Sequence, residues 1–166
     1  MKKVSLTMIV VLVAHCATLA FAADPAQEAR NLVDLAINMF QDQGKDHALK
    51  AINDKHGPFV RGEMYVFALT MDNVMVGHPH EHTIRRVNMN NFQDAAGTAL
   101  FQRFKEVVER QGSGWVEYLW AKPGETMASP KKSFVKKVPD TDLYVGAGYY
   151  LPMGTTAQTP RKTGAR

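Results

Sequence analysis

The sequence predicts an α+β domain, in which an antiparallel sheet of about five strands carries a long N-terminal helix and a middle helix. Apolar residues recur at helical spacing over residues 25–43 and 98–111. Between and after these helices lie segments that are rich in β-branched and aromatic residues, as strands are. Short turn sequences join most of the strand segments, and short connections favour antiparallel pairing.

The first predicted helix begins at Asp24-Pro25. The Asp side chain can accept hydrogen bonds from the free N–H groups of the first turn, and Pro at the first helical position has no N–H to satisfy. Gly44 is expected to end this helix. A shorter helix is predicted over residues 46–55, before the chain turns toward the sheet.

The strand predictions rest on composition and alternation. Residues 64–71 are apolar on both alternations, which is typical of a central strand, and Asp72-Asn73 is turn chemistry that lets residues 74–78 return beside it. The middle helix over residues 98–111 follows an irregular polar segment. The remaining predicted strands are residues 115–121, 133–138 and 143–151.

The two ends of the chain differ from the middle. Residues 1–22 read as a signal peptide, with Lys2 and Lys3 before an apolar run and Ala20-Phe21-Ala22 as the cleavage site. An uncleaved membrane anchor is the alternative. Residues 23–152 are expected to form one domain, and residues 153–166 a disordered polar and basic tail. We therefore expect a periplasmic or secreted protein with no stable membrane span after cleavage.

The charge distribution argues against nucleic-acid binding. The formal net charge is +4, from 20 basic and 16 acidic residues. Five of the basic residues lie in the leader and the tail, which leaves 15 basic against 16 acidic residues in the body. A body with a net charge near −1 lacks the basic excess that phosphate binding requires.

No catalytic or cofactor motif stands out in the sequence. Ser113 and Ser133 lack the strand–turn–helix context of a nucleophile elbow. Gly146 and Gly148 lack the third glycine and the following helix of a dinucleotide site. The sequence therefore predicts a protein that is not an enzyme and that uses no cofactor.

Six blocks, in the right order and spacing, resemble a known family, the type 2 single Cache domain. The blocks are Tyr65–Leu69 with Asp72, Gly77-His78-Pro79, Asn88 with Asp94–Gly97, Gly114–Trp120 with Pro123-Gly124, Lys132–Lys136, and Val145–Tyr150. The resemblance implies a PAS-like antiparallel sheet in an extracytoplasmic sensor module. It also implies that a small ligand, often a short organic acid, binds on one face of the sheet.

Members of this family usually sit between two membrane helices of a chemoreceptor or kinase. This chain shows no second membrane segment in its sequence, so we expect a free-standing exported version that acts with a membrane receptor or sensor kinase. Two motif positions differ from the family pattern. Arg86-Val87-Asn88 stands where Gly-Lys-Asn is frequent, and Phe134 replaces a tyrosine.

The predicted ligand site combines an aromatic wall with a cation, which suits a small carboxylate. Period-two alternation places Tyr118 and Trp120 on one side of their strand, and it places Phe134 and Lys136 together on the next. Lys136 is the predicted anion anchor because the resemblance matches it to the family's lysine at this strand. The remaining predicted ligand-binding residues are Tyr65, His78 and Arg86.

Two alternatives stay open at this level. In the first, the pocket is vestigial and the chain is a periplasmic protein-interaction domain. In the second, the loop carrying His78, His80 and His82 binds a metal, since alternating histidines can ligate zinc, copper or nickel. An ordinary reading also exists for each predicted site residue: Tyr118 and Trp120 can be plain core, and Lys136 can extend to solvent.

Overall fold

The computed structural model describes residues 24–152 and residue 154, so the predicted leader and nearly all of the predicted tail lie outside the described residues. The helices are α1 (Pro25–Gln43), α2 (Lys45–Ile52), the short 3-10 helix η1 (His82–Ile84) and α3 (Leu100–Gln111). The strands are β1 (Val60–Arg61), β2 (Met64–Thr70), β3 (Met75–Gly77), β4 (Ser113–Ala121), β5 (Ala128–Lys137) and β6 (Leu143–Tyr150).

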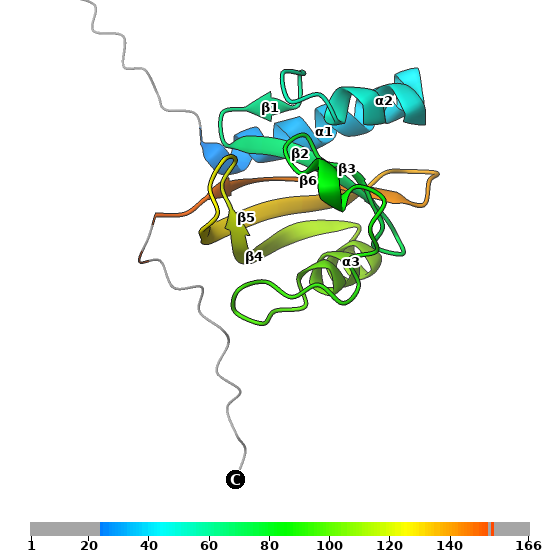
Figure 1. Ribbon diagram of the computed structural model, residues 1–166. Coiled ribbons are helices and arrows are strands. Elements are labelled where there is room, and N and C mark those ends of the chain that lie inside the picture. The colour runs from blue at the N-terminus through cyan, green and yellow to red at the C-terminus, as the bar shows by residue number, and fades with distance from the viewer. Residues whose placement is uncertain (1–23, 153, 155–166) are drawn as a thin grey trace, which may run out of the picture.

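All of these strands pair antiparallel in one sheet. The order across the sheet is β1-β2-β6-β5-β4, and β3 pairs with β2 beside this path. Helices α1 and α2 cover one face, and α3 lies against the other (Figure 1). The α+β fold class predicted from the sequence is confirmed, with one short extra strand, β1.

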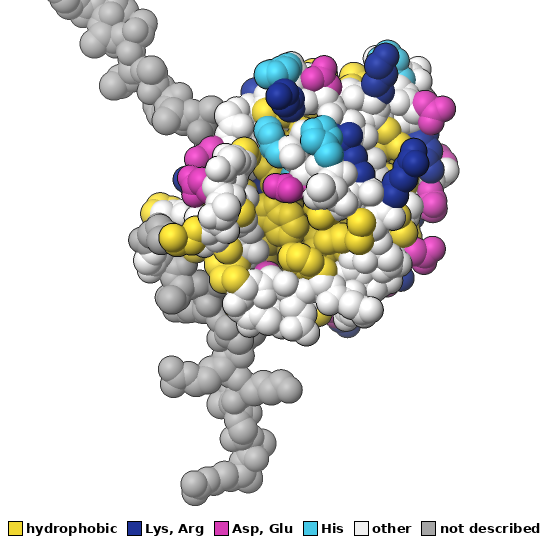
Figure 2. Space-filling model, viewed as in Figure 1, with side chains coloured by type: hydrophobic (Ala, Val, Ile, Leu, Met, Phe, Trp, Pro, Cys, Tyr) yellow, Lys and Arg dark blue, Asp and Glu magenta, His cyan; other side chains and the backbone are white. Residues whose placement is uncertain are grey.

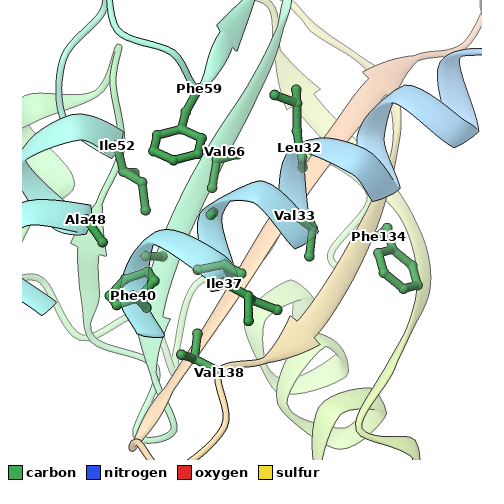
Figure 3. Packing of buried hydrophobic residues seen from close by; sticks show 14 of the residues in the cluster. Leu32, Val33, Ile37, Phe40, Ala48, Ile52, Phe59, Val66, Phe134 and Val138 are labelled. Atoms are coloured by element: carbon green, nitrogen blue, oxygen red, sulfur yellow. The ribbon is translucent and has the colours of Figure 1, made fainter. Parts of the chain in front are cut away.

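The layer between α1 and the sheet is a continuous apolar core. Leu32, Val33 and Ile37 of α1 point onto the sheet, where Val66 of β2 and Phe134 of β5 meet them (Figure 3). Helix α1 starts as its sequence predicts, because Asp24 Oδ1 accepts a hydrogen bond from the N–H of Ala26 at 3.0 Å. This core covers one of the two faces of the sheet.

The second core lies between α3 and the opposite sheet face. Phe101, Phe104 and Val108 of α3 pack on this face, and the Phe104 ring stacks on Phe67 of β2 with 5.5 Å between ring centroids. Helix α3 is predominantly polar on its outer side, so its single apolar stripe fixes which side meets the sheet. The candidate site forms within this second layer.

Two glycines of β6 leave space on the α3 side of the sheet, and groups of the neighbouring strands fill it. A Cβ at Gly146 would collide with the ring of Phe67. A Cβ at Gly148 would collide with the hydroxyl of Ser133 and the carbonyl oxygen of Lys132. The Gly-x-Gly sequence therefore serves packing within the sheet.

We expect Gly148→Ala to lower the free energy of unfolding by about 1–3 kcal/mol, the usual cost of overpacking a well-packed interior. Urea denaturation monitored by tryptophan fluorescence measures this loss. Adding Ser133→Ala should recover only part of it, because the Lys132 carbonyl oxygen still occupies the space. A Gly148→Ala protein as stable as wild type would contradict the close approach described here.

Candidate functional site

A narrow cavity of about 10 Å³ lies between the sheet and α3. Its walls are mostly aromatic and apolar side chains from β2, β3, α3 and β4. His78, from the loop after β3, adds an imidazole to them. The lining residues are Tyr65, Phe67, Met75, His78, Leu100, Phe101, Phe104, Tyr118 and Trp120. Figure 2 shows hydrophobic side chains gathered on the surface of this face, directly beside the histidines. An apolar cavity with few polar groups is typical of a small-molecule site.

His78 supplies a defined polar group to the cavity wall. The residue follows β3 and is only 2% exposed. Its Nδ1 accepts hydrogen bonds from the backbone N–H of Glu81 at 2.9 Å and of His80 at 3.3 Å. Nδ1 is thus an acceptor, which assigns the ring proton to Nε2. Burial lowers the pKa of His78 well below its ordinary value, and the charge of Lys131 lowers it further, so the ring is neutral.

Lys131 is the most unusual side chain of this face. It is 0% exposed, and its Nζ has no hydrogen-bond partner among the described residues. The Nζ lies 3.7 Å from the centroid of the Tyr65 ring and 4.9 Å from that of Tyr150. Burial holds the pKa of Lys131 well below its ordinary value. A buried amine that faces two aromatic rings is costly, because it has lost its hydration without gaining a hydrogen bond.

His80 brings a second unpartnered polar atom to the same place. Its ring lies edge-on to Tyr65, with 5.0 Å between centroids, and its buried Nε2 has no partner among the described residues. Burial lowers the pKa of His80, and the charge of Lys131 adds to this effect. Two polar atoms without partners thus flank Tyr65, which lines the cavity, although neither Lys131 nor His80 lines it directly.

The hydroxyl groups nearby are better satisfied. Tyr118 and Ser133 share a buried hydrogen bond of 2.9 Å between their oxygens. The Tyr150 hydroxyl donates to the carbonyl oxygen of Ala121 at 2.6 Å, and burial raises its pKa to about 12. Burial also raises the pKa of Tyr65 well above its ordinary value, so this phenol stays neutral. The tyrosines therefore add polar but uncharged surface.

The loop before α3 closes one side of the site. Asp94 accepts hydrogen bonds from the N–H of Leu119 at 3.0 Å and of Thr98 at 2.8 Å, which ties the loop to β4. Phe92 of this loop then packs on Trp120, with 5.5 Å between ring centroids. Burial alone would raise the pKa of Asp94, but the backbone N–H groups outweigh it and lower the pKa.

The structure brings four of the seven sequence-predicted site residues together: Tyr65, His78, Tyr118 and Trp120 all line the cavity. Phe134 belongs to the core under α1, on the opposite face of the sheet. Arg86 is exposed in the loop after η1, with a backbone φ of 67°, and does not line the cavity.

Lys136 also lies on the α1 side, where its Nζ donates to Asp34 Oδ1 at 2.8 Å and is partly exposed. The alternation that pairs it with Phe134 is correct. The expectation that this pair shares a face with Tyr118 and Trp120 is wrong, because Tyr118 pairs with Lys131 in the β4–β5 register, whereas Phe134 pairs with Trp115. Lys131, which pairs with Tyr118, is the cation of β5 that lies beside the cavity-lining Tyr65.

The geometry does not favour the metal alternative. Among residues 24–152 and 154, no three His, Cys, Asp or Glu side chains are placed to hold one ion. His78 Nδ1 is occupied by backbone N–H groups, and the centroids of the His78 and His80 rings are 6.5 Å apart. His82 is exposed in η1.

Sequence reasoning did not single out Lys131 or Tyr150, and it named His80 only as a candidate metal ligand beside His78 and His82. For Lys131 a signal existed, since it stands two residues before Ser133 and so shares that residue's side of the strand.

In the part of the chain that the structure describes, no helix has both the length and the apolar character needed to cross a membrane.

Comparisons with known proteins agree with this architecture. Residues 29–155 match the family profile described as the Cache domain. A periplasmic sensor domain of a chemotaxis protein shares 31% identity, covers 75% of this chain and 89% of that chain, and superposes with a TM-score of 0.62. A Cache chemosensory domain described for its recognition of carboxylic acids is 24% identical, covers 75% and 87%, and has a TM-score of 0.63, which indicates the shared fold.

A curated relative is the methyl-accepting chemotaxis protein McpP of Pseudomonas putida, which is 26% identical over 77 residues. The matched stretch is 46% of this chain and 14% of that receptor. The similarity thus concerns one part of a much longer protein. Because the family profile spans most of the chain and the fold agrees with it, this chain belongs to the Cache domain family of extracytoplasmic sensory domains.

Proposed function

We propose that this chain is an exported sensory domain that binds a short carboxylate in the cavity beside Lys131 and acts with a membrane-bound receptor or sensor kinase. The observation that carries the proposal is the buried Lys131 Nζ, which has no partner among the described residues and lies 3.7 Å from the centroid of a cavity-lining ring. A carboxylate would give this amine the counter-charge and the hydrogen bond that it lacks.

The rest of the cavity suits the remainder of such a ligand. The Nε2–H assigned to His78 can donate to the second carboxylate oxygen, and the buried His80 Nε2 is available for another polar contact. Apolar walls from Phe67, Phe101 and Phe104 suit a short hydrocarbon chain. The narrowness of the cavity favours a small metabolite over a peptide.

The comparisons support the proposed class of partner. The similarity to a periplasmic sensor domain of a chemotaxis protein and to part of a methyl-accepting chemotaxis protein supports a role in chemotactic signalling. Export rests on the leader predicted over residues 1–22, which lies outside the described residues.

A thermal-shift comparison of propionate, propionamide and propylamine tests the ligand class, because the three differ mainly in charge. We expect propionate to raise the melting temperature by several degrees, since ligand at about 100 times its Kd stabilises a protein by ~2.7 kcal/mol. The neutral amide and the cationic amine should have little effect.

Equal stabilisation by propionamide would contradict a charge-based site. If a wider set of short acids, amino acids and divalent metals also gave no stabilisation, a protein-interaction domain with a vestigial pocket would be the better interpretation. Calorimetric titration then gives the affinity of whichever acid stabilises most.

A further inference from the structure

The backbone of His78 is held from two directions by side chains outside the cavity. Its N–H donates to Asn53 Oδ1 at 3.0 Å, and its carbonyl oxygen accepts from Arg85 Nη2 at 2.7 Å and Arg85 Nε at 3.0 Å. Asn53 caps the C-terminal end of α2, and Arg85 follows η1. His78 is therefore fixed by groups that come from both sides of it in the sequence.

Arg85 and Asn53 are also joined to each other. Arg85 Nη2 donates to the Asn53 carbonyl oxygen at 3.1 Å, and Asn53 Nδ2 donates to the carbonyl oxygen of Val76 in β3 at 3.3 Å. The guanidinium thus bridges two backbone carbonyls, and no carboxylate pairs with it among the described residues. Because its N–H groups bond main-chain oxygens, this arginine holds the backbone in one conformation, and the planar guanidinium is suited to that role.

We propose that Arg85, together with Asn53, is a positioning residue of the ligand site: it fixes the His78 backbone so that the imidazole presents Nε2–H to the cavity. This inference rests on the proposed function, because it assigns a role to the same site. Neither residue lines the cavity, so both act through His78.

The orientation follows from the turn after His78. Nδ1 of His78 accepts from the N–H groups of His80 and Glu81, so the ring is aligned by the chain direction of residues 78–81. Arg85 holds the start of that turn at the His78 carbonyl. Releasing the carbonyl would let the turn shift, and the Nε2–H of His78 and the ring of His80 would move with it.

The positive charge of Arg85 has a second effect on the same ring. Burial is the main cause that lowers the pKa of His78, and the charges of Lys131, His80, Arg85 and His82 lower it further. Glu81 also stands in this turn, and its N–H bonds the His78 ring. A neutral His78 is required because protonation would place a hydrogen on Nδ1, where two N–H groups already point.

The test compares Arg85→Gln with Arg61→Gln. Arg61 also donates to two main-chain carbonyls, of Pro58 and Val60, but it is exposed and makes no contact with His78, so it is a matched control. NMR of the His78 ring nitrogens reports the tautomer and the titration without any ligand. We expect one Nε2–H tautomer in wild type and Arg61→Gln, and in Arg85→Gln a mixture of tautomers with a higher pKa for His78.

Propionate titration supplies the functional readout. Arg85→Gln should bind propionate about tenfold more weakly, which corresponds to the loss of one oriented hydrogen bond. The loss should vanish in a His78→Phe background, because Arg85 acts through His78. Arg85→Lys keeps the charge but lacks the planar guanidinium. It should therefore show the low pKa of His78 without the full affinity for propionate. The same variant replaces Arg85→Gln in the test if Arg85→Gln fails to fold.

Two results would overturn the proposal: an unchanged tautomer and pKa of His78 in Arg85→Gln, or an equal loss of affinity with and without His78. Failure of the proposed function is distinguishable from these. If wild type binds no carboxylate while the His78 signals still change in Arg85→Gln, the positioning role stands and the ligand class is wrong.

Discussion

Replacing Lys131 by methionine is expected to weaken carboxylate binding by about 10- to 150-fold, the equivalent of ~1.5–3 kcal/mol for a hydrogen bond to a charged group. Methionine keeps the length of the apolar stem and removes the amine. Because the Nζ has no partner in the described part of the ligand-free chain, the substitution deletes no hydrogen bond there. The same variant should therefore be more stable than wild type without ligand, by roughly 1–3 kcal/mol.

This pair of opposite effects is what distinguishes a ligand anchor from a structural lysine. Replacing a lysine that supports the fold would make the protein less stable. Replacing a lysine whose partner is a bound carboxylate should make the ligand-free protein more stable. Thermal denaturation without ligand and calorimetric titration with propionate measure the two effects separately.

Lys136→Met is the informative comparison. The resemblance of the sequence to the family favours Lys136 as the anchor, whereas the structure pairs its Nζ with Asp34 on the opposite face of the sheet. We expect Lys136→Met to change propionate affinity little and stability by no more than about 1 kcal/mol, as for an exposed ion pair. A loss of binding in Lys136→Met with none in Lys131→Met would contradict the assignment made here.

The fold could be predicted because its signals are local and repeated. The apolar stripes of α1 and α3 each define one buried face, and the apolar run of β2 is explained by cores on both faces of the sheet. Strand β5 was predicted to start at Ser133 but starts at Ala128. The missed part contains Pro130, a residue type that is unusual in a central strand because it cannot donate to the ladder. Here Pro130 pairs with Leu119, and its carbonyl oxygen accepts from Leu151 at 2.8 Å.

The error in the site comes from the register between β4 and β5. Alternation within β5 correctly groups Phe134 with Lys136, but it does not say which face of the sheet they share with β4. That choice depends on the register across the β4–β5 connection, in which Ala121 pairs with Ala128. A one-residue difference in this connection would exchange the faces, because side chains alternate with a period of two. The sequence signals around Pro123-Gly124 mark a turn without fixing its length.

Buried polar atoms were harder still to foresee. His80 looks like a solvated loop residue in the sequence, and only the turn after His78 brings its ring against Tyr65. Arg85 likewise has no motif, since its partners are two main-chain carbonyls, one 7 and the other 32 residues away in the sequence. Contacts of this kind depend on tertiary packing, and no periodic pattern in the sequence predicts them.

The final prediction concerns pH. At a pH above the pKa of Lys131 in the free protein, binding of propionate should take up a proton, and its affinity should fall by up to about tenfold per pH unit. Burial lowers this pKa well below the value of 10.5 expected for the unfolded chain. A carboxylate beside the amine would raise it again, so the bound form holds a proton that the free form lacks.

The free energy of unfolding depends on pH with the opposite sign to the affinity. Between the lowered pKa of Lys131 in the folded protein and the ordinary value of 10.5, the unfolded chain carries a proton that the folded chain lacks. The free energy of unfolding of the ligand-free protein should therefore rise with pH across this window, and fall as pH decreases toward the lowered pKa. Bound propionate should reduce the slope, because the liganded folded state keeps its proton.

Calorimetric titrations in two buffers of different ionisation enthalpy, at the same pH, measure the proton uptake directly. Lys131→Met should show neither the uptake nor the pH slope, whereas Lys136→Met should keep both, because its amine is partly exposed and already paired with Asp34. Affinity that is independent of pH in wild type would mean that Lys131 is charged before the ligand arrives. In that case the buried amine would not be the titrating anchor, and the source of binding would have to be sought at His78 and His80.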